Sequence, residues 1–180
     1  DNAELKLQGI ANLVRLEART ATINGAPGVS IRDLIKSALR MRPDRIVVGE
    51  VRGEETVDMI SSAMLNGHSG SMSTGHANNP TDMLHRLETM MLMGIDLPLQ
   101  AIQRQVALDI IIHLGRLRDK TRKVLQIVEV EGYEDGRIQT KVLYEFKEEG
   151  MKNGKIQGCL MKKNEITNKE KLLAAGYHTI

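Results

Sequence analysis

RIVVGEVRG, residues 45–53, is a short apolar run interrupted by the carboxylate of Glu50. A second short run, GSMST at residues 70–74, is followed closely by His76. The first run is typical of a fully buried parallel strand, and α/β folds place their ligands at the carboxyl ends of such strands. We therefore expect Glu50 and His76 to face the same crevice and to form part of a site.

The composition is that of one globular domain, with 41% hydrophobic and 27% charged residues among 180. A net charge of +2 gives no strong field for nucleic acid, and 2% aromatic residues leave little for base stacking. The single Cys159 excludes an internal disulfide and a cysteine-based zinc cluster. No apolar run approaches the roughly 20 residues that span a bilayer, and no signal peptide is visible. The chain begins at Asp1, and we expect it to be a piece of a longer protein.

The apolar spacing predicts alternating helices and strands over the first two thirds of the chain. The expected strands there are residues 12–16, 46–48, 70–74 and 108–114, and the expected helices 30–43, 54–65, 79–93 and 98–106. Ser30 with Asp33, and Asn79 before Pro80, have the chemistry of helix N-caps.

The last third of the chain has a different pattern. Strands at 124–130 and 138–146, joined by the turn YEDG at 133–136, predict an antiparallel hairpin at the edge of the sheet. Residues 147–163 show little periodicity, and a short helix is expected near 168–175. The predicted fold class is α/β, a mostly parallel sheet flanked by helices, with a C-terminal antiparallel β-hairpin extension.

Several chemistries fit the two strand ends. Glu50 can hold Mg²⁺ through water, orient an attacking water or accept a proton, or it can simply pair with Arg52. Small residues around His76 leave room for a phosphate that the imidazole can contact. His68, His76 and Glu50 can alternatively ligate zinc as in a hydrolase, although zinc ligand pairs usually lie close together on one helix.

Arginines are dense in the first third of the chain, where their planar guanidinium groups suit phosphate oxygens. They are Arg15, Arg19, Arg40, Arg42, Arg45 and Arg52. The chain contains no G-x-x-x-x-G-K-[ST] phosphate loop. From the residues alone we predict a phosphate-ester or nucleotide site that is incomplete.

The run SALRMRPDRIVVGEVRG at residues 37–53 resembles the secretion ATPases of the type II/type IV superfamily. Within them it is most similar to the CpaF branch, the Tad pilus assembly motors, and to their VirB11- and GspE-like relatives. The resemblance extends from residue 1 to about residue 130. It includes DNAEL at 1–5, VRLEAR at 14–19, GH at 67–68, STGHAN at 73–78, RLE at 86–88 and LGRLR at 114–118.

The resemblance implies a RecA-like P-loop domain that forms homo-hexameric rings and hydrolyses Mg-ATP to drive protein export or pilus assembly. It assigns residues 46–53 to the Walker B element, with Glu50 as the acid near Mg²⁺. Glu4 ends an acidic "Asp box" and is a candidate for positioning water or Mg²⁺, while His76 lies in a His box that contacts the γ-phosphate. The other ATP-binding residues that the resemblance implies are Arg15, Arg19, Arg52, His68 and Thr74.

The resemblance also implies a cytoplasmic protein, peripheral at the inner face of the cell membrane, that engages an inner-membrane platform protein. It implies no nucleic-acid partner and no membrane span. Residues 1–146 are then the C-terminal portion of the RecA-like domain, and residues 147–180 are an extension of unknown role.

The chain departs from the family pattern in two places. The Walker A loop and the first carboxylate of the Asp box are absent from these 180 residues. We therefore expect negligible ATP hydrolysis by the 180-residue chain, measured as phosphate release; robust turnover that Glu50→Gln abolishes would contradict this. A non-hydrolysing nucleotide-sensing or scaffold module and, less favoured, a zinc hydrolase are the alternatives.

Overall fold

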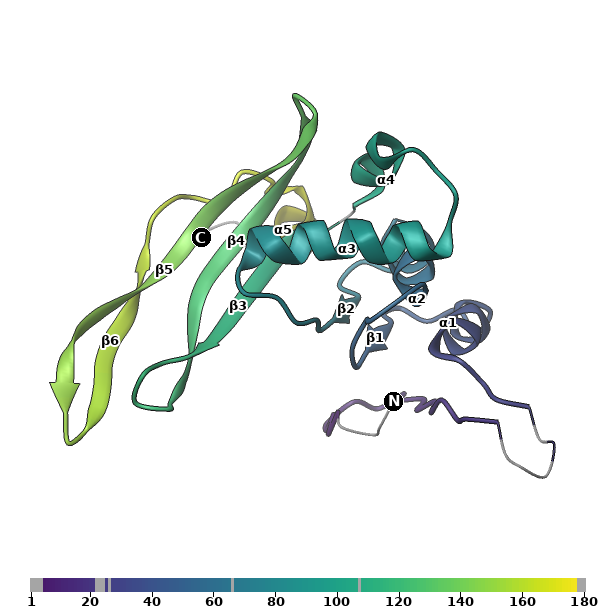
Figure 1. Ribbon diagram of the computed structural model, residues 1–180, viewed down its shortest axis with the longest axis horizontal. Helices are drawn as coiled ribbons and strands as arrows, with labels where there is room; N and C mark the ends of the chain where they lie inside the picture. The colour runs from purple at the N-terminus through teal and green to yellow at the C-terminus, as the bar shows by residue number, and fades with distance from the viewer. Residues whose placement is uncertain (1–4, 22–24, 26, 66, 107, 178–180) are drawn as a thin grey trace. The chain divides into compact units, whose positions relative to one another are not determined.

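The computed structural model describes residues 5–21, 25, 27–65, 67–106 and 108–177 (Figure 1). It divides into two compact units, Asp1–Ala107 (unit 1) and Leu108–Ile180 (unit 2). No helix in the described part of the chain is long and apolar enough to cross a membrane.

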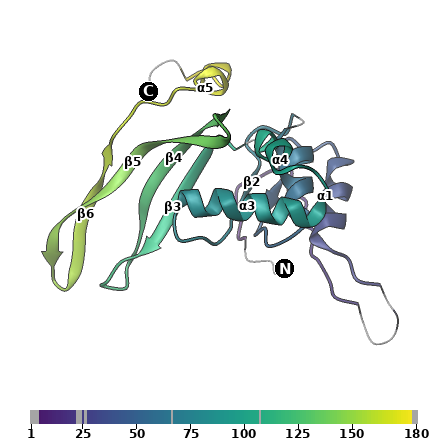
Figure 2. The same ribbon diagram turned by 45° about the horizontal axis from the view of Figure 1, so that its top comes forward.

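Unit 1 contains the alternating helices and strands. Its elements are α1 (Ile31–Leu39), β1 (Val47–Val48), α2 (Glu55–Val57), the π-helix η1 (Asp58–Met64), β2 (Met72–Ser73), α3 (Pro80–Gly94) and α4 (Leu99–Gln105). β1 and β2 pair in parallel, with Val47 opposite Met72 and Val48 opposite Ser73. Within this unit α3 lies alongside the two strands and α4 (Figures 1 and 2). The core is formed mainly by Ile35, Val48, Met59, Ile60, Leu84, Leu87, Met91 and Ile102.

The helix starts in unit 1 confirm the predicted caps. The Ser30 hydroxyl accepts a hydrogen bond from the Asp33 backbone N–H at 3.1 Å, and the Asp33 carboxylate accepts one from the Ser30 N–H at 3.0 Å. The Asn79 side chain accepts from the Asp82 N–H at 2.8 Å, with Pro80 as the first helical residue. Caps of this kind depend on residues within one turn, which is why the sequence reveals them.

Two expectations for unit 1 need correction. The strand predicted at 12–16 is wrong: residues 13–18 have no regular structure, and Val14 and Leu16 are exposed. The helix predicted at 54–65 is confirmed in position, but its type differs. After one α-helical turn the chain continues as the π-helix η1. Its wider turn is visible in the hydrogen bond from the Leu65 N–H to the Ile60 carbonyl, five residues back.

Unit 2 is a four-stranded antiparallel sheet. Its strands are β3 (Ile110–Arg116), β4 (Arg122–Glu134), β5 (Arg137–Lys152) and β6 (Lys155–Lys162), paired in that order, and α5 (Glu170–Ala174) follows them. Both long hairpins turn through residues with positive φ, Asp135-Gly136 between β4 and β5 and Asn153-Gly154 between β5 and β6. The hairpin predicted around residues 133–136 is therefore confirmed.

The predicted place of this hairpin is corrected. Among the described residues, strands β3 to β6 form a sheet of their own and do not extend the edge of the β1–β2 sheet. Residues 147–163, expected to be irregular, complete β5 and form β6, because Asn153-Gly154 is itself a hairpin turn that the composition of the segment obscured. The boundary expected between 146 and 147 falls within β5, whereas the two compact units divide between 107 and 108.

A buried carboxylate attaches the C-terminal segment to the sheet of unit 2. Glu129 on β4 is 2% exposed and accepts hydrogen bonds from the backbone N–H groups of Thr167, at 2.9 Å, and Asn168, at 2.8 Å. Its carboxylate also lies 3.1 Å from the Nζ of Lys141. The charge of Glu129 is thus satisfied by donors from a segment that is distant in sequence.

Candidate functional site

The ends of β1 and β2 are held together by backbone and side-chain bonds. The Val51 N–H donates to the Thr74 carbonyl at 3.0 Å, and the Thr74 hydroxyl donates to the Gly49 carbonyl at 2.5 Å. These bonds continue the pairing of the two strands beyond their last regular residues. They place Glu50, which follows β1, opposite His76, which follows β2.

Each of the two carboxylate oxygens of Glu50 contacts a basic side chain. Its Oε2 lies 2.6 Å from the Nη2 of Arg52, and its Oε1 lies 3.1 Å from the Nε2 of His76. The Glu50 side chain is 19% exposed, whereas those of Arg52 and His76 are 62% and 78% exposed. The prediction that Glu50 and His76 meet is confirmed, and the pairing with Arg52, considered as an alternative, exists together with it.

The surroundings of Glu50 favour its charged form. The hydrogen bond from Arg52 is the main cause that lowers the pKa of Glu50 below its ordinary value. Partial burial opposes this shift, while the positive charge of Arg52, and then those of His76 and Arg86, add to it. Glu50 is therefore an anion at neutral pH and can accept a hydrogen bond or a proton.

The loop after Glu50 is fixed by a residue that the sequence did not single out. The Glu55 carboxylate accepts hydrogen bonds from the backbone N–H groups of Arg52, at 2.7 Å, and Gly53, at 3.0 Å. Glu55 is the first residue of α2, and its side chain reaches back to N–H groups of the loop that precedes the helix. The position of Glu55 at the start of the helix was the signal from which the sequence could have identified it. The hydrogen bonds that its carboxylate accepts hold Arg52 beside Glu50.

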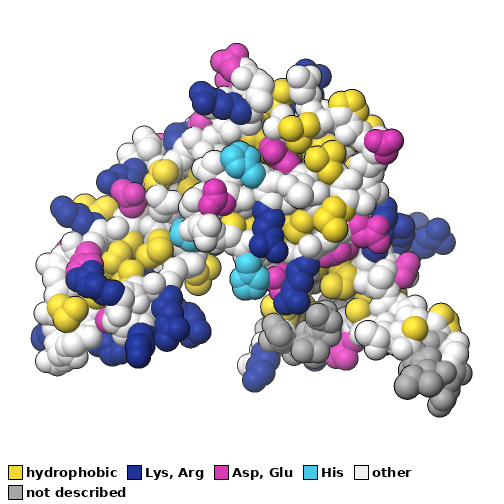
Figure 3. Space-filling view, viewed as in Figure 1, with side chains coloured by type: hydrophobic (Ala, Val, Ile, Leu, Met, Phe, Trp, Pro, Cys, Tyr) yellow, Lys and Arg dark blue, Asp and Glu magenta, His cyan; other side chains and the backbone are white. Residues whose placement is uncertain are grey.

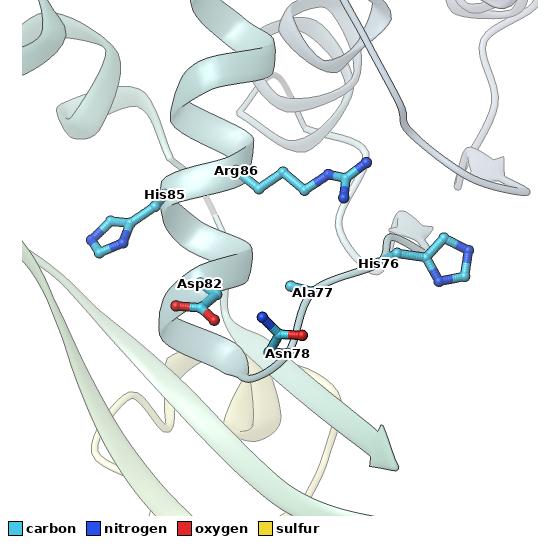
Figure 4. A pocket seen from close by; sticks show the side chains of 6 residues that line it. All are labelled: His76, Ala77, Asn78, Asp82, His85 and Arg86. Carbon is cyan, nitrogen blue, oxygen red and sulfur yellow. The ribbon is translucent and has the colours of Figure 1, made fainter. Parts of the chain in front are cut away.

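A pocket of about 530 Å³ opens next to His76. It is lined by His76, Ala77, Asn78, Asp82, His85 and Arg86 (Figure 4). In Figure 4 the Arg86 side chain extends from α3 toward the side on which His76 lies, while His85 projects from the opposite side of the helix. Arg86 was part of the quoted RLE motif but was not predicted to be a site residue.

Several other predicted site residues have structural contacts in this chain. The Nδ1 of His68 lies 2.7 Å from the Pro43 carbonyl, which can only accept, so His68 donates there. Arg15 donates to the Leu7 carbonyl at 2.9 Å, and the backbone of Arg19 pairs with Val29. Within the described ranges, no hydrogen bond or ion pair joins Arg15, Arg19 or His68 to Glu50. Glu4 lies outside the described residues.

The described residues contain no group of three or more His, Cys, Asp or Glu side chains able to hold a metal ion. The zinc site proposed from His68, His76 and Glu50 is not assembled, since the His68 ring is turned to Pro43. Mg²⁺ requires less of the protein, because it keeps several waters and is bound mainly through substrate phosphates. An anionic Glu50 fits such a water-mediated role.

The family model for "Type II/IV secretion system protein" matches residues 1–169. The chain belongs to this family. It is 41% identical over 134 residues to a protein of Mycobacterium tuberculosis named for conjugal transfer, an alignment that covers 74% of this chain and 38% of that protein. It is also 41% identical over 90 residues to the type IV secretion system protein PtlH of Bordetella pertussis, covering 50% and 26% of the two chains.

One solved structure shares part of this fold. It is the VirB11 ATPase of the Brucella suis type IV secretion system in complex with sulphate, with 34% identity and a TM-score of 0.51. The match covers 55% of this chain and 31% of that one. This chain thus spans less than half the length of these relatives, and the likeness supports an α/β fold.

Proposed function

We propose that this chain carries the Walker B and His-box part of a RecA-like ATPase site in a secretion motor. The observation that carries the proposal is the contact between Glu50 and His76 at the ends of two parallel strands. Family membership and the likeness to a VirB11 ATPase support ATP and Mg²⁺ as the ligands. The Walker A phosphate loop would come from the rest of the longer protein.

Phosphoryl transfer needs positioning and charge stabilisation more than covalent chemistry from the protein. Glu50, held as an anion by Arg52, orients the attacking water or accepts its proton. His76 donates a hydrogen bond to a phosphate oxygen when it is released from Glu50. Mg²⁺, when bound, neutralises the charge of the β- and γ-phosphates.

Arg15 and Arg19 are proposed to supply further positive charge to ATP, either within their own subunit or to a neighbouring subunit of a homo-hexamer in the full-length form. Glu4 is proposed to position water. We assign the motor to the CpaF-like branch that assembles Tad pili, which acts at an inner-membrane platform protein from the cytoplasmic side. The second candidate is a non-hydrolysing nucleotide-sensing module, and an intact phosphate loop upstream would argue against it.

Removal of Mg²⁺ provides the test. A longer form of the protein that includes the upstream part is expected to release phosphate from ATP in the presence of Mg²⁺. EDTA should reduce this release to background, and an excess of Mg²⁺ should restore it, because the charge of the phosphates is otherwise not neutralised. Phosphate release that survives EDTA, or that Zn²⁺ but not Mg²⁺ restores, would contradict the proposal.

A further inference from the structure

Two hairpins of unit 2 carry like charges at directly opposite positions. Arg116 on β3 lies opposite Arg122 on β4, beside the turn that joins these strands. Lys152 on β5 lies opposite Lys155 on β6, beside the next hairpin turn. Like charges at opposite positions destabilise an antiparallel pair of strands. The stability of the sheet therefore does not explain either pair.

The turn between β3 and β4 is bonded to the neighbouring hairpin. The Asp119 carboxylate accepts hydrogen bonds from the Thr121 hydroxyl at 2.7 Å and from the Ile156 N–H on β6 at 2.7 Å. These two bonds, that of Thr121 first, lower the pKa of Asp119 to about 2. The Arg118 guanidinium bonds to both carboxylate oxygens of Glu148 on β5. The two hairpin ends are thereby held together as one surface.

The cations of this surface have no side-chain hydrogen bond or ion pair to any described residue. We call them the basic end of unit 2: Arg116, Lys120, Arg122, Lys123, Lys152 and Lys155. All of them except Lys123 are exposed. The carboxylates of Asp119 and Glu148 lie among them but already accept the bonds described above. In Figure 3, Lys and Arg side chains gather where these hairpins end.

The distribution of charge favours a short anionic ligand. In the rest of unit 2 acidic residues outnumber basic ones, so a long polyanion that extends beyond the basic end is repelled. None of the residues 116–123 and 152–155 is aromatic, which leaves nucleic-acid bases without a stacking platform. These observations argue against a nucleic acid.

The shape of the surface favours a peptide over a membrane. The two hairpins end at the same narrow end of the sheet, so the cations do not spread over one of its broad faces (Figures 1 and 2). An extended peptide with an acidic residue at every second position presents carboxylates about 7 Å apart on one side. Each guanidinium offers a planar fork of N–H groups that matches a carboxylate.

We propose that the basic end of unit 2 binds a short acidic segment of a partner protein, with Arg116 and Arg122 as the main contacts to its carboxylates. The partner supplies the negative charges that the two like-charged pairs lack within the described chain. The proposal uses none of the residues around Glu50 and does not depend on ATP hydrolysis.

The test uses the 180-residue chain and a fluorescently labelled peptide in which glutamate alternates with serine. Fluorescence anisotropy at low ionic strength should show saturable binding, and a peptide with glutamine in place of glutamate should not bind. The double variant Arg116→Gln/Arg122→Gln should weaken binding at least about tenfold. Added salt should weaken binding to the unchanged chain, because it screens exposed charges.

The double variant Arg137→Gln/Lys169→Gln is the matched control. It removes the same amount of charge from exposed positions elsewhere in unit 2 and should bind the peptide as the unchanged chain does. Equal weakening in both double variants would show that only net charge matters and would overturn the proposal. Urea unfolding should show no loss of stability in Arg116→Gln/Arg122→Gln; a clear loss would give these residues a structural role and would also overturn it.

Other occupants of the surface are tested in the same way. Vesicles of phosphatidylcholine and phosphatidylglycerol, and a DNA oligonucleotide, replace the peptide. Tighter binding to either than to the peptide, lost in Arg116→Gln/Arg122→Gln, would refute a protein partner. Sedimentation of the chain alone tests a second copy: self-association that this double variant prevents would assign the surface to contacts between copies instead.

Discussion

Replacing Glu50 by glutamine in the longer protein is expected to lower ATP turnover by about 10²- to 10⁴-fold while changing ATP affinity little. Glutamine has the shape of glutamate but cannot accept a proton or carry the negative charge. The hydrogen bond from Arg52 is the main cause that lowers the pKa of Glu50 below its ordinary value, so this side chain carries its negative charge at neutral pH. The substitution therefore removes the chemical property that the site maintains.

The measurement is steady-state phosphate release together with equilibrium binding of a fluorescent ATP analogue. Glu134→Gln is the matched control, since Glu134 is exposed at the end of β4 and should leave turnover unchanged. Glu50→Asp, which keeps the charge but shortens the side chain, should retain part of the activity. Lost nucleotide binding with normal turnover per bound nucleotide would refute the role assigned to Glu50.

Replacing Glu129 by alanine is expected to destabilise unit 2 by about 3 kcal/mol. The substitution leaves the N–H groups of Thr167 and Asn168 without their acceptor and removes one carboxylate from Lys141. Lys141 keeps Glu131 as a partner at 3.1 Å, which moderates the loss. Urea unfolding of the 180-residue chain, followed by circular dichroism, measures the change.

The effect of Glu129 should depend on pH. Burial alone would raise the pKa of Glu129, but the N–H groups of Asn168 and Thr167 and the charge of Lys141 lower it by more, so the pKa lies below the ordinary value of 4.5. A carboxyl with a lowered pKa in the folded state stabilises the protein above its unfolded pKa and loses this effect as the pH falls through the folded value.

The difference in stability between the unchanged chain and Glu129→Ala should therefore be complete at neutral pH and shrink in acid below about pH 4.5. Glu134→Ala, which removes an exposed carboxylate, should show little difference at either pH. A Glu129→Ala effect that stays constant down to strongly acid pH would show that the charge of Glu129 has no part in it.

Local chemistry explains most of what could be predicted. Ser30 and Asn79 begin helices because each side chain accepts from an N–H three residues on, a pattern visible in sequence. The meeting of Glu50 and His76 was also predictable, because parallel strands bring their carboxyl ends to one edge. The π-helix at residues 58–64 was not, since its apolar residues also fit an ordinary helix.

The sequence by itself determined the family, the N-caps of α1 and α3 and the contact between Glu50 and His76. The tertiary structure decided which strands share a sheet, because each apolar strand can pair with several others and only packing selects among them. It also distinguished the arginines: Arg52 bonds to Glu50 and Arg86 faces the pocket, whereas Arg15 donates to a backbone carbonyl. A guanidinium acquires its role from the groups around it, and those groups come together only when the chain folds.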